Sequence, residues 1–572
     1  MAGVYKRSGN YGGFNGLRQE RRRGRAQAVS APPEAPAGAP TGVPDPVPGP
    51  GASSPRGGLL RSTAVFSAMT LLSRVAGFVR DMLQATLFGT GGAMSAFIVA
   101  YRIPNFLRRV FAEGSMAMAF VPVLNEIRER RDHAALKSFI DHMAGALCAV
   151  VLVVCAAGVL LAPAITTLFT PGALDEPDKF AQTTLMLRIT FPYLAFISMM
   201  SLAASILNST GRFALPAFTP VLHNLTMIAA MFWLAPRFEV PPVGLAWGVL
   251  IAGFLQLVLL WPALGRLGLR PRLRPGFRHP EVRKVARLML PTLFSSSVAQ
   301  VNLLVGTAFA SLLVDGSQDW LYYSDRLIEF PLGLFGVALG TVILPHLSRR
   351  HAAADATGYS RSLDWGLRMA LLAGVPAGLG LLLLAEPITA TVYNYGRFTA
   401  LDTRMAAISL TAMSIGIPAF MLSKVLAPAF YARQDTKTPM RAAILTVVAN
   451  ILLTVAFTTP LWLNGTPGAH GGIALATGLA GIVNAWLLWR ALRRGGLHAP
   501  QPGWRRFLLL LALACAAMTV VVLGLRDRIG DWTAIEGVLP RVLWLLAVIA
   551  AGAAAYAVAL FAAGLRPREL RQ

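Results

Sequence analysis

Residues 138–162 read SFIDHMAGALCAVVLVVCAAGVLLA. From Met143 to Ala162 this segment carries no charged side chain. As a helix it is long enough to cross the hydrocarbon core of a bilayer, which is about 30 Å thick. A helix also satisfies its own backbone hydrogen bonds, as a lipid-exposed segment must. The segment is therefore predicted to be a transmembrane helix.

Similar apolar runs recur from residue 64 almost to the C-terminus. Of the 572 residues, 55% are hydrophobic and only 14% are charged, and the mean hydropathy is +0.57. These values exclude a soluble enzyme with a single membrane anchor and indicate an all-α polytopic membrane protein. About fourteen helices are predicted, at 64–88, 93–113, 138–162, 185–209, 217–234, 241–263, 286–313, 320–345, 365–385, 403–430, 439–460, 469–491, 504–525 and 540–565.

The charges between these helices alternate from turn to turn. Turns such as 172–180 and 314–319 are acidic or nearly neutral, although Arg397 and Arg404 depart from the pattern. By the positive-inside rule the basic turns are cytoplasmic, which places both termini in the cytoplasm. This alternation explains the net charge of +25 without nucleic acid. The basic turns are 128–137, 266–284, 349–361, 433–441 and 493–506.

Residues 1–60 are rich in Pro, Gly, Ala and Arg, and contain no apolar run that could form a signal peptide. We interpret them as a disordered cytoplasmic tail. Its basic cluster, Arg21–Arg23 with Arg25, is expected to lie against anionic lipid headgroups rather than nucleic acid.

Several local matches share one offset of 223 residues. Pro122 in AFVPVL corresponds to Pro345 in VILPHL, and Pro216 corresponds to Pro439. Ile165-Thr166 and Ile388-Thr389 have the same spacing. The matches predict two parallel six-helix halves, 62–284 and 285–507, followed by two extra helices in 508–566. Parallel halves are typical of transporters with a central substrate cavity and alternating access.

Ionisable side chains are costly inside a membrane, so those within the predicted helices indicate a cavity or a partner of opposite charge. Arg74 and Asp81, seven residues apart, share one face of their helix. The candidates are Arg74, Arg80 and Asp81 in 64–88; Arg102, Asn105, Arg108, Arg109 and Glu113 in 93–113; Asp325, Arg326 and Glu329 in 320–345; and Lys424 in 403–430.

This set holds seven cations and four carboxylates, an excess of three positive charges. Arginine stays protonated, and its planar guanidinium pairs bidentately with phosphate. The excess therefore predicts a substrate bearing phosphate or pyrophosphate rather than a cationic drug. Two alternatives remain open: some of the arginines could be snorkelling residues at a cytoplasmic helix end, and Asp325 with Arg326 could be a structural ion pair. The predicted substrate-binding group is Arg74, Arg80, Arg108 and Arg326.

Catalytic chemistry has little support in the sequence. No metal-ligand cluster, activated nucleophile, P-loop or dinucleotide fingerprint stands out, so no metal and no cofactor is predicted. His142 and His346 lie near helix ends, and no chemical role is predicted for them. The three cysteines lie in apolar runs and are interpreted as buried hydrophobic residues. Transport would then draw on an ion gradient, the membrane potential or consumption of the substrate.

Five strings in this chain closely resemble the MurJ/MviN family of lipid II flippases, in the multidrug/oligosaccharidyl-lipid/polysaccharide exporter superfamily. The resemblance runs from about residue 60 to 566. It implies a flippase of the bacterial inner membrane that carries the undecaprenyl-pyrophosphate-linked peptidoglycan precursor, lipid II, to the periplasmic leaflet. The strings are SRVAGFVRD, FIVAYRIPNFLRRVFAEGSMAMAFVPVL, YYSDRLIEFPLGLFGVALGTVILPHLS, YNYGRFTALD and KVLAPAFYARQDTKTP.

The family's functional arginines fall on Arg74, Arg80, Arg108, Arg109 and Arg326, and its acidic positions fall on Glu113, Asp325 and Glu329. Where some relatives carry an acidic residue in a GxxxDAF-like string, this chain reads GGAMSAF and has Ser95. A carboxylate at that position is therefore not indispensable here. By resemblance, the last two helices form a groove for the polyprenyl tail.

The resemblance also implies partners, namely lipid II, membrane lipids and the cell-wall synthesis machinery. Coupling to a monovalent cation or to the membrane potential is consistent with carboxylates beside arginines. Three rival functions remain: a flippase for another polyprenyl-linked glycan, an ion-coupled multidrug exporter, and a membrane-embedded glycosyltransferase or phosphatase. The excess of arginine counts against the exporter, which would need acidic residues for cations.

Overall fold

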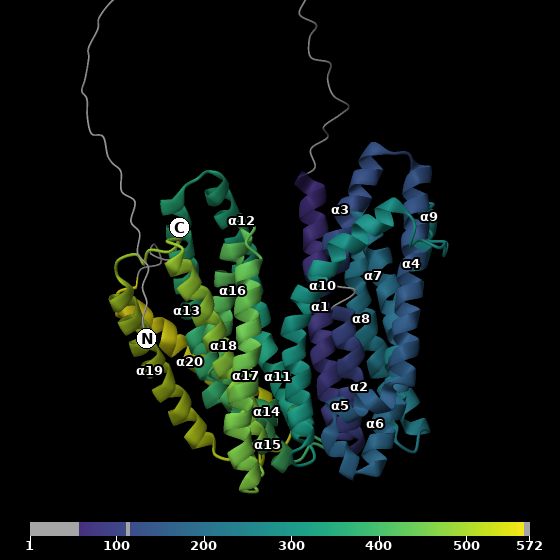
Figure 1. Cartoon of the computed structure of the whole chain (residues 1–572). Helices are drawn as coiled ribbons and strands as arrows, with labels where there is room; N and C mark the ends of the chain where they lie inside the picture. Colours follow the sequence, from purple (N-terminus) through teal and green to yellow (C-terminus); the bar gives the residue numbers. More distant parts are fainter. Residues whose placement is uncertain (1–55, 110–114, 566–572) are drawn as a thin grey trace, which may run out of the picture. The chain divides into compact units, whose positions relative to one another are not determined.

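The computed structural model describes residues 56–109 and 115–565, in which every regular element is a helix (Figure 1). Most of the predicted N-terminal tail and Glu113 lie outside the described residues. Residues 58–572 form one compact unit. The all-helical membrane fold predicted from the sequence is confirmed within the described ranges.

The first predicted half contains helices up to α9. They are α1 (Arg56–Phe88), α2 (Gly92–Arg108), α3 (Ser115–Arg130), α4 (His133–Leu160), α5 (Ala162–Phe169), η2 (Pro171–Asp175), α6 (Pro177–Thr190), α7 (Tyr193–Ser209), α8 (Ala214–Ala229), η3 (Ala230–Leu234), η4 (Ala235–Arg237) and α9 (Pro241–Arg266).

The remaining helices begin with α10 and end with the two appended helices. They are α10 (Pro280–Ser311), α11 (Ser317–Pro331), η5 (Leu332–Gly336), α12 (Val337–Ala352), α13 (Ala356–Leu383), α14 (Ala385–Tyr393), α15 (Ala400–Ser414), α16 (Ile417–Tyr431), α17 (Lys437–Leu463), α18 (His470–Arg494), α19 (Trp504–Ile529) and α20 (Val538–Ala562).

Each of the fourteen predicted segments coincides with one of these helices or with two or three consecutive ones. Within the described residues, ten helical stretches are long and apolar enough to span a membrane, and the pair α15–α16, bent by 44°, makes eleven. The other predicted segments coincide with α1, α2 and α10. The predicted count of fourteen fits this arrangement.

Several predicted helices are broken where the sequence contains proline. Within the segment 185–209, α6 ends and α7 begins on either side of Pro192. Within 320–345, the π-helical turn η5 follows directly after Pro331. The bend between α15 and α16 lies at Gly416, just before Pro418. Proline removes one backbone donor and clashes with the preceding turn, so a helix kinks or restarts there.

The 223-residue offset seen in the sequence also relates the helix bounds. α4 begins at His133 and α13 at Ala356, while α6 begins at Pro177 and α15 at Ala400. The short helices α5 and α14 begin at Ala162 and Ala385. Corresponding helices thus follow one another in the same order along both stretches of chain.

Helix α10 contacts both groups of helices. Near its start, Lys284 Nζ lies 2.6 Å from Glu126 Oε2 of α3, and Glu281 Oε1 lies 2.9 Å from Arg131 Nη2. Farther along, Asn302 Oδ1 accepts a 2.6 Å hydrogen bond from Asn450 Nδ2 of α17. α10 therefore links the two groups, and the division at residue 284 stays a prediction.

The appended helices α19 and α20 pack against each other and against α13 (Figure 1). The segment that leads into α19 is held on α13 by the buried carboxylate of Asp364, which accepts hydrogen bonds from Trp504 Nε1 at 2.7 Å and Gln501 N at 3.2 Å. These contacts fix where α19 begins. They also set the wall of an apolar groove described below.

Candidate functional site

A polar cavity of about 260 Å³ lies between α2 of the first group and α10, α11, α15 and α18. Six of the residues proposed from the sequence line it. Its polar lining consists of Tyr101, Arg102, Asn105, Arg109, Asn302, Tyr322, Asp325, Arg326, Glu329 and Thr477. The cavity thus brings together side chains from spans that are more than two hundred residues apart in the sequence.

Arg102 projects from α2 and is 7% exposed. Its Nη1 donates a 2.7 Å hydrogen bond to Thr307 Oγ1, and its Nη2 lies 3.9 Å from Asp325 Oδ2. A buried arginine needs such partners because an unpaired charge is costly inside the protein. Arg102 is therefore a built part of the cavity and not a snorkelling residue at a helix end.

Arg326 and Tyr322 both project from α11. The Tyr322 ring centre lies 4.9 Å from the Arg326 guanidinium carbon and 5.5 Å from that of Arg102. Arginines this close to an aromatic face are attracted by its quadrupole. Arg326 Nη1 also donates a 2.8 Å hydrogen bond to the exposed carboxylate of Glu329.

Asp81 of α1 is buried and connects this group to Arg80. Its Oδ1 accepts hydrogen bonds from Arg80 Nη2 at 2.7 Å and from Tyr322 Oη at 3.3 Å, while Arg326 Nε lies 3.9 Å from Oδ2. One carboxylate thus serves an arginine from each group of helices. Arg80 Nη1 donates in addition to Asn224 Oδ1 of α8 at 3.0 Å.

The other proposed residues lie outside this central cluster. Arg108 Nε donates to Asn105 Oδ1 at 2.8 Å, one turn earlier on α2. The guanidinium of Arg74 lies so close to Gly333 in η5 that a side-chain carbon on Gly333 would overlap it. Lys424 is exposed, packs beside Gly336 and does not line the cavity.

Tyr322, Thr307 and Asn224 are not among the residues predicted from the sequence, although all three contact site arginines. A signal for Tyr322 exists, since it precedes Arg326 by four residues and so shares its helix face. Asn224 stands out as an amide within an apolar span. Thr307 gives no comparable signal, because threonine is common in membrane helices.

A second, apolar groove of about 1120 Å³ lies beside the polar cavity. It is bounded by α11–α13 on one side and by α19 and α20 on the other, and aliphatic and aromatic side chains make up almost all of its lining. Arg326 lines both the groove and the polar cavity. A charged site and a long apolar surface therefore meet at one side chain.

Most of the sequence is similar to one family of known proteins. The family model for the lipid II flippase MurJ matches residues 84–542. The probable lipid II flippase MurJ of Vibrio cholerae is 44% identical over 520 residues, which cover 90% of this chain and 98% of that protein. The chain belongs to the MurJ lipid II flippase family. The lipid II flippase MurJ of Burkholderia cenocepacia, another relative, is 40% identical over 90% of this chain and 99% of its own length.

Solved structures place the fold within the same family. A structure of the lipid II flippase MurJ in an inward closed conformation has a TM-score of 0.72 and 27% sequence identity, and the match covers 87% of this chain and 98% of that one. An inward-facing multidrug resistance MATE transporter of the MOP superfamily has a TM-score of 0.58 at 13% identity, covering 76% of this chain and 98% of that one. The second likeness concerns the fold alone.

The charges around the cavity favour an anionic ligand. Three arginines and two carboxylates line it, and Glu329 is more than half exposed while it pairs with Arg326. An anion that enters can replace Glu329 as the partner of Arg326, because a surface carboxylate is readily solvated by water. Planar guanidinium groups at several angles suit a tetrahedral phosphate or a pyrophosphate.

Proposed function

We propose that this protein moves lipid II, the undecaprenyl-pyrophosphate-linked peptidoglycan precursor, from the cytoplasmic to the periplasmic leaflet of the bacterial inner membrane. The observation that carries the proposal is that Arg326 belongs both to an arginine-lined polar cavity and to a large apolar groove. An amphiphile with an anionic headgroup and a long hydrocarbon tail matches that pair of surfaces. The names of the relatives support lipid II as this amphiphile.

In this proposal the pyrophosphate binds to Arg102, Arg109 and Arg326. Charge-assisted hydrogen bonds from arginine to phosphate are short and strong, and they strengthen as water leaves the cavity. The carboxylates of Asp325 and Glu329 keep the arginines partnered while the cavity is empty. When the headgroup binds, its pyrophosphate replaces these carboxylates as the partner of the arginines. The protein performs no covalent step.

The polyprenyl tail lies in the apolar groove formed by α13, α19 and α20 and stays in contact with lipid. Because the lipid tails around the groove are as apolar as its lining, the tail is held there by packing contacts and does not enter the polar cavity. The headgroup alone then has to cross the membrane as the two halves rock about the cavity.

The proposed orientation rests on the charges of the turns. The arginine-rich turns, together with both termini, face the cytoplasm, and the turns at 172–180 and 314–319 face the periplasm. Energy for net transport comes from the membrane potential or from a monovalent cation. Moving one charge through 100 mV is worth about 2.3 kcal/mol.

The decisive experiment is depletion of the protein in living cells, complemented by Arg326→Ala or by the wild type. An externally added enzyme that cleaves only exposed lipid reports which leaflet holds lipid II. We expect depletion and Arg326→Ala to lower the cleavable fraction at equal membrane abundance. Arg266→Ala, at the exposed last residue of α9 and outside the cavity lining, serves as the matched control and should behave as wild type.

Unchanged exposure of lipid II after depletion would contradict the proposal. The substrate would then be sought among other polyprenyl-linked glycans, which present the same pyrophosphate and tail. Drug sensitivity measured in the same strains separates this outcome from multidrug export.

A further inference from the structure

The beginning of α2 and the beginning of α11 meet at the end of the helices opposite the arginine-rich turns. Here Asp319, in the first turn of α11, is fully buried. Its Oδ2 accepts a 2.5 Å hydrogen bond from the backbone N–H of Gly91 and a 2.7 Å hydrogen bond from Ser95 Oγ. A carboxylate of one half is thus held by a backbone amide and a hydroxyl of the other.

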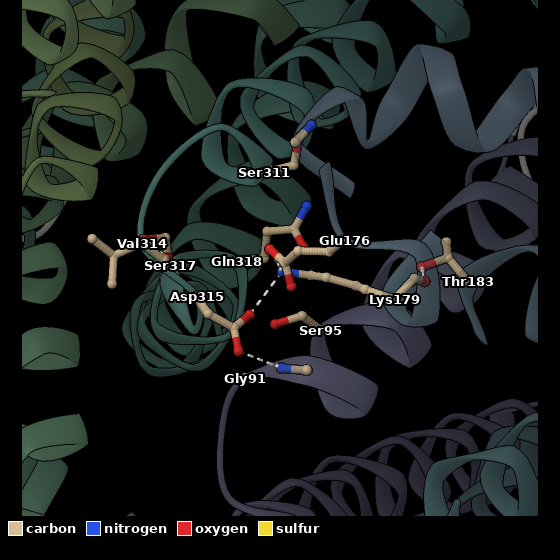
Figure 2. Close-up of polar contacts among 12 residues, drawn as sticks. Gly91, Ser95, Glu176, Lys179, Thr183, Ser311, Val314, Asp315, Ser317 and Gln318 are labelled. Carbon is tan, nitrogen blue, oxygen red and sulfur yellow. Dashed lines mark hydrogen bonds and ion pairs between the residues drawn. The ribbon is translucent and has the colours of Figure 1, made fainter. Parts of the chain in front are cut away.

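A second carboxylate repeats the arrangement one turn earlier. Asp315 Oδ2 accepts a 2.6 Å hydrogen bond from Gly92 N, and its Oδ1 lies 2.7 Å from Nζ of Lys179. Figure 2 shows Lys179 reaching from α6 to Asp315, with Ser95 close by on α2. The Lys179 side chain is buried, whereas the Asp315 side chain is 45% exposed, so water reaches this ion pair from one side.

The local sequence explains why two successive amides point at the acids. Gly91 and Gly92 have φ angles of 87° and 45°, a region that side chains disfavour and glycine adopts freely. A side-chain carbon on Gly91 would lie 2.6 Å from Asp315 Oδ2. The first amides of α2 have no partner within the helix, and its dipole favours negative charge at this end.

The hydrogen bonds to Asp319 stabilise the closed contact, but they satisfy only one of its two carboxylate oxygens. Hydrogen bonds to an ionised group contribute more than neutral ones, about 1.5–3 kcal/mol each. Asp319 Oδ1, however, is buried and accepts no hydrogen bond from the described residues. Water would satisfy that oxygen once the two ends separate, so the cost of opening is partly offset.

We propose that Asp319 and Ser95 form an acid–hydroxyl latch that keeps the periplasmic ends of the two halves together, and that Asp319 is a positioning residue of the transport cycle. The inference rests on the proposed function for its orientation and for the meaning of opening. The latch closes by burying Asp319 against Gly91 and Ser95, and it opens by exposing the carboxylate to water. The contact needs one acid and one hydroxyl, and either helix can supply the acid, because the hydrogen bond joins α2 to α11.

The contact can be tested by exchanging the side chains at positions 95 and 319. Asp319→Ser removes the acid, and Ser95→Asp places two acids face to face. The double variant Ser95→Asp/Asp319→Ser restores one acid and one hydroxyl with the partners reversed. A residue with a merely local role in α11 would not be rescued by a change in α2.

The readout is the opening of this end, measured separately from transport. Leu303 lines the cavity, so a Leu303→Cys reporter is placed in a background lacking Cys148, Cys155 and Cys515. A membrane-impermeant thiol reagent is added from the periplasmic side of spheroplasts. We expect each single variant to be labelled about tenfold faster than the parent, and the double variant to return toward the parental rate.

Asp319→Asn tests the same point with an isosteric side chain, in case Asp319→Ser is not inserted. Asp178→Asn, an exposed acid at the same end of the molecule, is the matched control and should be labelled at the parental rate. Parental labelling of Asp319→Ser and Asp319→Asn, or a double variant as fast as the single ones, overturns the latch. If depletion leaves lipid II exposure unchanged while the variants are labelled as expected, the result counts against the proposed substrate and not against the latch. The two failures are therefore distinguishable.

Discussion

Single residues in the cavity differ in how firmly they are held. Arg80 and Arg102 are buried and each has at least two polar partners, whereas Arg74 and Lys424 are exposed. Ser95 illustrates how one position can mislead when it is considered alone. The GGAMSAF string lacks the acid that some relatives carry, yet a carboxylate is present at the same place because Asp319 faces Ser95 across the interface.

Asp81 is buried and has three polar or charged partners. It serves Arg80, Arg326 and Tyr322, so Asp81→Asn leaves the buried Arg80 with a neutral partner, whereas Arg326 keeps Glu329. Breaking a buried pair by removing one charge costs about 3–5 kcal/mol. We expect a clear loss of thermal stability in detergent, followed by unfolding fluorescence. Asp178→Asn should leave the transition unchanged, and an equal transition in Asp81→Asn would refute the assigned pairing.

Gly333 provides the space in which Arg74 lies. Gly333→Ala should displace the flexible end of Arg74 without straining the backbone, because only a guanidinium has to move. We expect normal membrane abundance and lipid II flipping at least several-fold slower. Gly340→Ala is the matched control, since its nearest neighbour is Lys424 O at 3.7 Å, an ordinary contact. Similar flipping by both variants would remove Arg74 from the site.

Among the helices, α19 and α20 are distinguished by the apolar groove that they line. They face α13 across the apolar groove and carry no cavity residue. Their placement depends on the segment before α19, which is fixed to Asp364 of α13. Under the proposed function, these two helices supply a surface for the lipid tail and add nothing to the binding of the headgroup.

Filling the groove should act on the tail alone. Ala553 of α20 lines the groove, whereas its neighbour Ala554 is exposed and does not. Ala553→Trp is expected to weaken binding of the long-tailed lipid and to leave binding of a short-tailed analogue unchanged. Binding is measured by tryptophan quenching or calorimetry in nanodiscs. Ala554→Trp is the control, and equal effects of both variants on the long-tailed lipid would exclude the groove as its site.

The turn between α12 and α13 contains a titratable helix cap. Asp355 Oδ1 accepts a 2.7 Å hydrogen bond from Gly358 N, and this bond, despite some desolvation, lowers the pKa of Asp355 together with the ion pair to Arg350. Because the pKa of Asp355 is lower in the folded state, the ionised cap adds stability at pH values above the pKa of the unfolded state. This stability is lost as the pH falls through the pKa of the folded state. After correction for the intrinsic pH dependence of amide exchange, the protection of the Gly358 amide should therefore fall in acid. Asp355→Asn keeps the cap but should abolish this pH dependence.

At the scale of the whole molecule, α10 and the latch connect the two groups of helices in different ways. α10 is covalently continuous and packs against both groups. The contacts of Asp315 and Asp319 can open without breaking the chain. Pairing one permanent link with one reversible link is what a rocking transporter requires, because the halves must move without separating.

The proposed orientation predicts which turns are accessible from outside the cell. Thr533→Cys, in the turn between α19 and α20, should react with an impermeant thiol reagent in spheroplasts. Arg272→Cys, in the turn after α9, should react only after the membrane is permeabilised. Both are placed in the cysteine-free background. The reverse pattern would invert the molecule and place the termini in the periplasm.

By itself the sequence determined the helices, their apolar character and the arginine-rich composition of the site. These features are local, because a twenty-residue apolar run or a proline break needs no information from the rest of the chain. The strings around Arg102 and Arg326 were also sufficient to indicate the family.

Only the tertiary structure decided which candidates share one cavity. Arg102 and Arg326 meet around Tyr322, Arg80 is paired with Asp81 and Asn224, and Lys424 lies outside. Ser95 and Asp319 form a pair although 224 positions separate them. The physical reason is that these contacts depend on how distant helices pack and rotate against each other, and no periodicity within one helix encodes that.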